Sequence, residues 1–211
     1  MRRLTVTMFL SLDGVMQGPG GPDEDRDGGF DQGGWMVPYA DTDLMAWEKN
    51  WFERASGFLL GRRTFDIFAA YWPHITDEDD PIATRLNRLP KHVVSRGMPT
   101  PTWYDSTVIV GDVAEQVARL KADDPDGSGG ELQIHGSGDL VLSLLDQDLV
   151  DEYRLLICPV VLGAGRRMFV EGSPPTALRL VDSATTGSGV AVHVYRPAGR
   201  PAYGTYSLED S

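Results

Sequence analysis

Two glycine turns in this sequence have residue types that suit the binding of an anion. Each turn follows a predicted strand and opens a predicted helix: Gly61-Arg62-Arg63-Thr64 and Gly136-Ser137-Gly138. The N-terminus of a helix presents free N–H groups and the positive end of its dipole, and glycine lets a ligand approach the backbone closely. The first turn adds guanidinium groups and a hydroxyl. Together the two turns are suited to hold the two ends of a dinucleotide.

The pair Ser95-Arg96 is a third candidate anion clamp, because it places a hydroxyl beside a guanidinium where a predicted strand ends. Such a pair suits a phosphate like the 2′-phosphate of NADPH. Each segment alone has a plainer interpretation, as a simple turn or a solvated strand end. The three segments together favour an anion-binding site, since the exits of parallel strands meet at one edge of a sheet. Neither glycine turn completes G-x-G-x-x-G, so a standard Rossmann fingerprint is absent.

The elements that must position these segments alternate between strands and helices. Hydrophobic periodicity predicts strands over 4–12, 58–60, 91–95, 107–110, 132–135 and 151–161, and helices over 41–55, 65–71, 80–89, 112–122 and 140–145. Residues 178–182 and 190–196 are predicted to pair as a hairpin. The expected fold is three-layer α/β, with a mostly parallel sheet, helices on both faces and a C-terminal antiparallel hairpin. We expect one domain over residues 1–198 and a polar tail over 199–211.

The segment 17–34 is rich in Gly, Pro and Asp and is predicted to be a long surface loop, a kind of loop that often forms a lid. Asp23, Asp25 and Asp27 match the first half of a calcium-binding loop, but Gly34 stands where that motif requires glutamate. The four histidines lack the spacing of metal ligands, and His135 is better explained as a packed strand residue. We therefore expect no metal site.

Composition excludes several classes of function. The net charge is -12 at pH 7, which disfavours nucleic acid and anionic membranes as partners but leaves room for a small anionic ligand in a pocket. Cys158 is the only cysteine, so an intrachain disulfide and Cys-based zinc motifs are excluded. The apolar N-terminal run is short and lacks a small-residue cleavage site, and no stretch approaches the ~20 apolar residues of a membrane span. A cytoplasmic location is the expectation.

In their order along the chain, these motifs resemble the dihydrofolate reductase fold. The resemblance rests on Ser11-Leu12-Asp13-Gly14, Leu60-Gly61-Arg62-Arg63-Thr64-Phe65, Ser95-Arg96 and His135-Gly136-Ser137-Gly138. From Arg3 to about Pro197 the chain is more closely similar to the branch named after the C-terminal reductase domain of the bifunctional riboflavin-biosynthesis deaminase-reductase. The run from Pro159 to Phe169, with Gly163, Gly165 and Met168, fits that branch well.

The resemblance implies an oxidoreductase that uses NADPH, of the 5-amino-6-(5-phosphoribosylamino)uracil reductase type. The deaminase half is excluded, because its H-x-E and P-C-x-x-C motifs need more than one cysteine. By the same resemblance, Gly61, Arg62, Arg63 and Thr64 bind the cofactor phosphates, Ser95 and Arg96 bind the adenosine end, and Gly136, Ser137, Gly138 and Asp139 bind the pyrophosphate and nicotinamide side. A homodimer is also implied.

The substrate and the proton donor are open at this point. A small heterocycle is expected, with Gly163, Gly165 and Arg166 as candidate substrate-binding residues. Dihydrofolate or another pterin is the alternative substrate, and for it Asp43, with Asp41 as a rival, is the candidate catalytic carboxylate. Asp13 is a second catalytic candidate. All three aspartates are equally explained as cap or turn residues. A further alternative is a nucleotide-binding protein of the same fold without catalytic activity.

Overall fold

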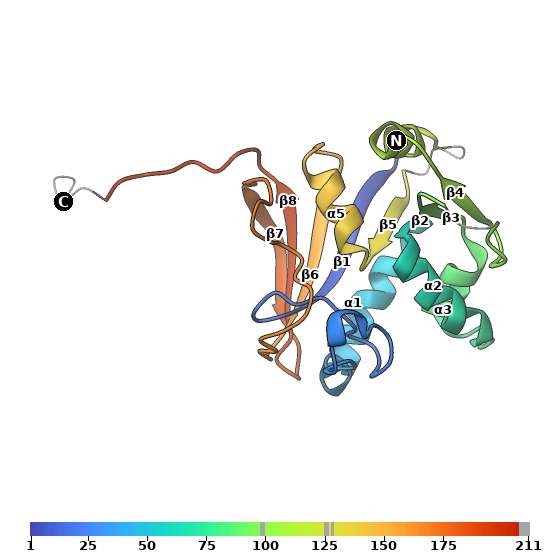
Figure 1. The fold of residues 1–211 in the computed structure, drawn as a ribbon, viewed down its shortest axis with the longest axis horizontal. Helices are drawn as coiled ribbons and strands as arrows, with labels where there is room; N and C mark the ends of the chain where they lie inside the picture. The colour runs from blue at the N-terminus through green and yellow to red at the C-terminus, as the bar shows by residue number, and fades with distance from the viewer. Residues whose placement is uncertain (98–99, 125–126, 128, 207–211) are drawn as a thin grey trace.

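The computed structural model describes residues 1–211 except 98–99, 125–126, 128 and 207–211. Its centre is one sheet with the strand order β4-β3-β2-β5-β1-β6-β8-β7, which runs across the molecule from β7 to β4 (Figure 1). The six strands from β4 to β6 are parallel, and β8 and β7 complete the sheet as an antiparallel pair. The strands are β1 (Arg3–Ser11), β2 (Ala55–Gly61), β3 (Lys91–Val94), β4 (Ser106–Ile109), β5 (Glu131–His135), β6 (Glu152–Cys158), β7 (Leu178–Thr185) and β8 (Ala191–Pro197).

Helices cover both faces of this sheet, as a parallel sheet requires. They are α1 (Thr42–Glu53), α2 (Arg62–Tyr71), α3 (Pro81–Arg88), α4 (Val113–Ala122) and α5 (Gly138–Leu145), with 3-10 turns at Asp27–Gly29, Val37–Tyr39 and Trp72–His74. Side chains of α4 and α5 pack into a core on one face, and those of α1, α2 and α3 pack on the other. The predicted three-layer α/β fold with a C-terminal hairpin is confirmed.

Local sequence signals account for most element boundaries. Asp41, Asp80 and Asp112 cap α1, α3 and α4 with side-chain hydrogen bonds, as their sequence positions predict. The predicted start of α2 at residue 65 was late, because the helix begins at Arg62 and Gly61 is its N-cap. The glycine turn is therefore the first turn of the helix.

Two predicted strands extend too far. β1 ends at Ser11, and Leu12 is 63% exposed, because the chain turns back so that Ser11 N donates to the carbonyl of Val15. β6 ends at Cys158, since the following Pro159 has no N–H to continue the ladder. Both corrections shorten strands at the edge where the candidate site lies.

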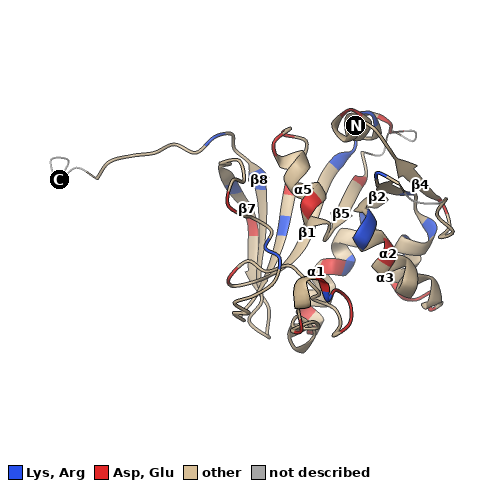
Figure 2. Cartoon of the chain, in the orientation of Figure 1, with Lys and Arg blue, Asp and Glu red and all other residues tan. Residues whose placement is uncertain are grey.

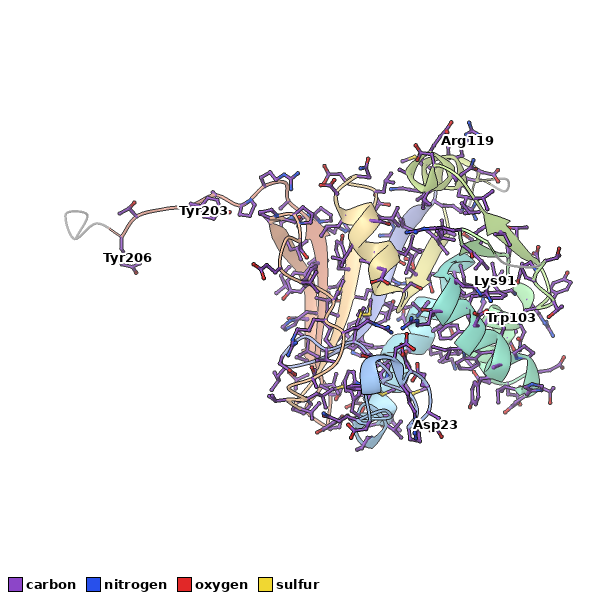
Figure 3. The ribbon with its side chains drawn as sticks, viewed as in Figure 1. Asp23, Lys91, Trp103, Arg119, Tyr203 and Tyr206 are labelled. Carbon is purple, nitrogen blue, oxygen red and sulfur yellow. The ribbon has the colours of Figure 1, made fainter. Side chains whose placement is uncertain are left out.

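The first residues of the predicted tail contact the body of the protein. Ala177 N donates to Gly199 O, and Arg200 Nη1 donates to the carbonyl of Pro175. The chain beyond Arg200 runs away from the sheet, where Figure 3 shows Tyr203 and Tyr206 exposed along it. Among the described residues, no helix combines the length and the hydrophobicity needed to cross a bilayer.

Candidate functional site

The two glycine turns lie side by side at the carboxyl edge of the sheet. β2 and β5 are neighbouring parallel strands, so the turns that follow them meet. Gly61 N donates to Ser137 Oγ at 3.0 Å, and Ser137 N donates to Thr64 Oγ1 at 3.1 Å. Ser137 adopts a left-handed conformation, with φ 56°. The sequence predicted this meeting of the turns, and the reciprocal hydrogen bonds fix their relative position.

The helices that open at these turns lack side-chain caps. Neither the N-terminus of α2 nor that of α5 receives a side-chain hydrogen bond at its cap, whereas α1, α3 and α4 are each capped by an aspartate. Uncapped first-turn N–H groups are free to bind an anion. The two turns are thus the helix starts that combine neighbouring positions with available donors.

The third predicted clamp lies beside the first. Arg62 Nη1 donates to the carbonyl of Gly97 at 3.4 Å, and Arg62 Nε pairs with Asp66 at 2.6 Å. Ser95 Oγ accepts from Gly97 N at 3.3 Å, and Arg96 is exposed. The segment after β3 therefore lies next to the N-terminus of α2, as expected from neighbouring parallel strands.

The acidic loop 17–34 reaches across this edge and contacts two candidate arginines. The carboxylate of Asp25, 8% exposed, pairs with both Arg63, at 3.4 Å, and Arg166. Asp27 pairs with the same two arginines. Gln17 holds the loop in place, because its Nε2 donates to Asp25 Oδ1 at 3.1 Å and its Oε1 accepts from Arg166 N at 3.0 Å. A predicted cofactor residue and a predicted substrate residue thus share one carboxylate.

Met16, just before this loop, covers the second glycine turn. A Cβ atom on Gly138 would lie 2.0 Å from Cε of Met16, so a glycine at this position is needed for the side chain to pack there. A Cβ atom on Gly165 would lie 2.7 Å from Cγ1 of Val15, so this position also requires a glycine. A ligand that lies against Gly138 must therefore displace Met16.

Asp13 connects the end of β1 to the segment after β6. Its carboxylate accepts from Leu162 N at 3.1 Å and Gly163 N at 2.9 Å and pairs with Arg167 at 3.0 Å. The hydrogen bond from the Ser11 hydroxyl, together with the backbone donors, holds the pKa of Asp13 well below its usual range. These contacts give Asp13 a structural role, and its assignment as a catalytic residue stays a prediction.

Asp43 and Asp41 face the β7–β8 hairpin. Asp43 Oδ2 accepts from Gly187 N at 3.1 Å, and Asp41 Oδ2 accepts from Ser188 N at 2.6 Å. The hairpin lies at the far side of β6 from β5, so these contacts point away from the glycine turns. The alternative interpretation of both aspartates, as structural residues, fits these contacts better.

Glu48 is an acidic side chain in the middle of α1 that the sequence analysis missed. It lies one turn after Leu44 and one turn before Phe52, two buried residues, and therefore shares their sheet-facing side. Glu48 is half-buried, and the loss of solvent raises its pKa to about 7. An acid inside the apolar stripe of a helix was the signal that could have revealed it.

His135 packs against α1, and its ring is neutral at pH 7. Its ring stacks on Phe52 with centroids 4.3 Å apart and hydrogen-bonds to Gln133 at 3.1 Å. Burial lowers its pKa to about 3. The prediction of a packed strand histidine agrees with these contacts.

The profile of the RibD C-terminal domain matches residues 2–192. The chain belongs to the RibD C-terminal domain family. Two relatives from Bacillus subtilis (strain 168) match nearly the whole chain. The uncharacterized protein YyaP is 29% identical and covers 92% of this chain and 94% of its own length, and the uncharacterized protein YwjB is 25% identical with coverages of 92% and 98%.

Solved structures of RibD-related proteins share the fold. A putative riboflavin biosynthesis protein from Shewanella sp. PV-4 superimposes with a TM-score of 0.64 at 22% identity, covering 93% of this chain and 99% of that chain. RibD from Acinetobacter baumannii gives 0.62 at 13% identity over 94% of this chain and 58% of its own. Dihydrofolate reductase from Schistosoma mansoni gives 0.55 at 17% identity, with coverages of 92% and 98%. At these identities the structures show that the fold is shared.

Proposed function

We propose that this protein is an NADPH-dependent reductase of a small heterocycle, of the aminopyrimidine type that the RibD reductase domain acts on. The observation that carries this proposal is the pair of uncapped helix N-termini, α2 and α5, whose first residues hydrogen-bond to each other. This arrangement provides backbone donors for two neighbouring phosphates at one edge of a parallel sheet.

The residues around these turns fit the cofactor. Arg62, Arg63 and the N–H groups of α2 would bind phosphate, and Ser95 and Arg96 would bind the adenosine end, which the contacts of Arg62 and Ser95 with Gly97 support. Gly136, Ser137, Gly138 and Asp139 at the start of α5 would face the pyrophosphate and nicotinamide side. NADPH, when bound, supplies a hydride. The protein orients the two reactants and excludes water, with Met16 moving off Gly138.

Glu48 is our proposed proton source. A general acid works best when its pKa lies near the working pH, and burial places the pKa of Glu48 at about 7. Asp13, whose pKa is lowered, does not meet this condition. Glu48 projects from α1 between Leu44 and Phe52, toward the sheet on whose carboxyl edge the glycine turns lie.

The position of Glu48 on α1 favours a second candidate function. A carboxylate on the first long helix is the residue that reduction of dihydrofolate or another pterin requires, and Glu48 on α1 meets that requirement better than Asp43 does. Arg166, near the carboxyl edge, would instead favour a phosphate-bearing aminopyrimidine. A non-catalytic nucleotide-binding protein is the third candidate, and it requires NADPH binding without turnover.

The first test is a titration with NADPH and NADH, followed by quenching of tryptophan fluorescence and energy transfer to the reduced nicotinamide. We expect selective binding of NADPH and a loss of at least about tenfold in affinity, near 1.4 kcal/mol, in Arg63→Ala. Arg119→Ala, on the exposed surface of α4, is the matched control and should bind normally. Failure of the wild-type protein to bind either nucleotide would reject the reductase proposal.

The second test separates the substrates. NADPH consumption is measured with the phosphoribosylamino-pyrimidine and with dihydrofolate, for wild type and Glu48→Gln. Turnover of one substrate, lost in Glu48→Gln with NADPH affinity retained, identifies both the substrate and the proton donor. Unchanged turnover in the variant would remove Glu48 from the reaction. We also propose a cytoplasmic homodimer, which light scattering on purified protein checks for its oligomeric state.

A further inference from the structure

A cavity lies at the amino edge of the sheet, opposite the glycine turns. Its volume is about 490 Å³, within the range of small-molecule sites, and it lies between the C-terminal half of α1 and the strands β6, β8 and β7. Arg3, at the start of β1, contributes to it. The cavity adjoins the start of β1, whereas the glycine turns follow the opposite, carboxyl ends of β2 and β5, and no residue of either turn lines it. The cavity is therefore a separate place on the molecule.

Arginines dominate the wall of this cavity. The four that line it are Arg3, Arg54, Arg179 and Arg196, against the carboxylates of Glu152 and Asp182. Figure 2 shows the corresponding blue bands on β1 and β8. The whole chain carries a net charge of -12, so a concentration of positive charge here runs against its overall balance. Such a concentration is expected where an anion binds.

Each of the two carboxylates at this edge, Glu152 and Glu131, already pairs with more than one arginine. Glu152 pairs with Arg196 at 3.1 Å, with Arg3 at 3.6 Å and with the fully buried Arg154 at 2.9 Å. Glu131 pairs with Arg3 and Arg154 as well. Two carboxylates thus serve three guanidinium groups.

The remaining two arginines have no acidic partner within the described part of the chain. Arg54 donates to the neutral Asn50 Oδ1 at 2.5 Å, and Arg179 forms no ion pair with any described residue. Excess positive charge therefore faces the cavity, where an anionic ligand would supply the missing partner.

The pairing of β7 with β8 brings two of these arginines close together. Arg179 lies directly opposite Arg196 in the antiparallel register, so both side chains stand on the same face of the sheet. Like charges at directly opposed positions destabilise a sheet. An anion bound to Arg179 would offset this repulsion.

An aromatic wall completes the cavity. Trp47 and Trp51 of α1 line it, with ring centroids 5.5 Å apart. Trp51 is buried and also lies against the guanidinium of Arg154, 5.3 Å from its ring centroid. Trp47 is only partly buried, so its ring has a face open to a ligand. Aromatic rings beside guanidinium groups suit a ligand that has both a ring and a negative charge.

We propose that this cavity is a binding site for a small aromatic anion of the aryl phosphate class. The guanidinium groups of Arg54 and Arg179 bind the phosphate, and the ring of the ligand lies against Trp47. This site is independent of the proposed cofactor site at the other edge of the sheet.

The test uses phenyl phosphate as the probe and the indole N–H resonances of the tryptophans as the readout, assigned with Trp47→Phe. We expect saturable shifts at Trp47 and Trp51, and none at Trp103, which packs against Phe65 of α2 and does not line the cavity. Inorganic phosphate should bind at least several-fold more weakly, because it lacks the ring. The double variant Arg54→Ala/Arg179→Ala should lose at least tenfold in affinity.

Two controls separate this site from a general surface effect. Arg119→Ala and Arg63→Ala should keep the shifts of Trp47 and Trp51 on addition of phenyl phosphate, since neither residue lines the cavity. Arg179→Ala alone should keep or raise the Tm of the ligand-free protein, because it relieves the repulsion from Arg196 while weakening binding. Equal shifts in wild type and the double variant, or loss of binding in Arg63→Ala, would overturn the proposal.

Discussion

At the scale of single residues, burial sets the chemistry of Glu48. The carboxyl group lies on the side of α1 that faces the sheet, and its pKa is raised to about 7 from 4.5. The folded protein therefore binds one more proton than the unfolded chain between these pH values. The neutral form is the one that the surroundings favour.

We predict that the free energy of unfolding falls as pH rises from about 4.5 to 7, by up to about 3 kcal/mol from this residue. Glu48→Gln should remove that part of the pH dependence and be more stable than wild type at pH 8. Urea denaturation at pH 5 and pH 8 measures the free energy of unfolding of each protein. Glu53→Gln, exposed at the end of the same helix, is the control, and equal slopes in all three proteins would contradict the prediction.

Arg154 is the residue whose loss should cost the most stability. Its guanidinium is fully buried and pairs with Glu131 at 2.8 Å and Glu152 at 2.9 Å. Removal of one partner from a buried ion pair leaves uncompensated charge, so Arg154→Ala should lower the free energy of unfolding by about 3–5 kcal/mol. Urea denaturation measures the change. The exposed Arg119, labelled in Figure 3, gives the control Arg119→Ala, which should lose less than about 0.5 kcal/mol.

At the scale of elements, the loop 17–34 acts on the proposed cofactor site through its acidic side chains. Asp25 and Asp27 pair with Arg63 and Arg166, so the loop holds carboxylates where phosphates of a ligand would otherwise bind. Its own packing is supported by Gln17 and by the buried Trp35, whose Nε1 donates to the carbonyl of Gln17. The loop is thus a structured segment with a charge opposite to that of the site.

Asp25→Asn should raise the affinity for NADPH several-fold, because Arg63 loses a competing carboxylate. Asp23→Asn is the matched control, since Asp23 lies on the outer side of the loop and pairs with Arg26 there (Figure 3). Fluorescence titration at low and at physiological salt measures both. A decrease in affinity in Asp25→Asn would mean that the carboxylate positions the arginines for the ligand.

At the scale of the whole molecule, the tail is separable from the sheet. Its last described contacts to the body are those of Gly199 and Arg200, and Figure 1 shows the chain beyond them leading away. A chain that ends after Arg200 should keep its Tm to within about 1 °C, because residues 202–206 are exposed and bury little surface. Differential scanning calorimetry checks this. A fall of several degrees would indicate that the tail packs against another surface in solution.

Charge is distributed unevenly over the molecule. The protein is acidic overall, yet arginines gather at both ends of the sheet, at the glycine turns and at the cavity of the amino edge. Net charge alone predicted the partners that the surface disfavours. It did not reveal where positive charge collects, because that depends on which strands are neighbours.

The sequence by itself determined the features that depend on neighbours along the chain. Aspartate caps, the glycine turns and the strand and helix periods act within a few residues, so the helices predicted to start at residues 41, 80 and 112 begin at the caps Asp41, Asp80 and Asp112. The pairing of the two glycine turns also followed, since parallel strands place their exits at one edge.

Only the tertiary structure decided which side chains meet across the fold. Arg166 pairs with Asp25 although the two are 141 residues apart, and Arg179 stands opposite Arg196 because of the hairpin register. Glu48 acquires its raised pKa from packing against the sheet, and Asp13 its lowered pKa from donors brought by Leu162 and Gly163. Such contacts depend on strand order and burial, which no local pattern of residues encodes.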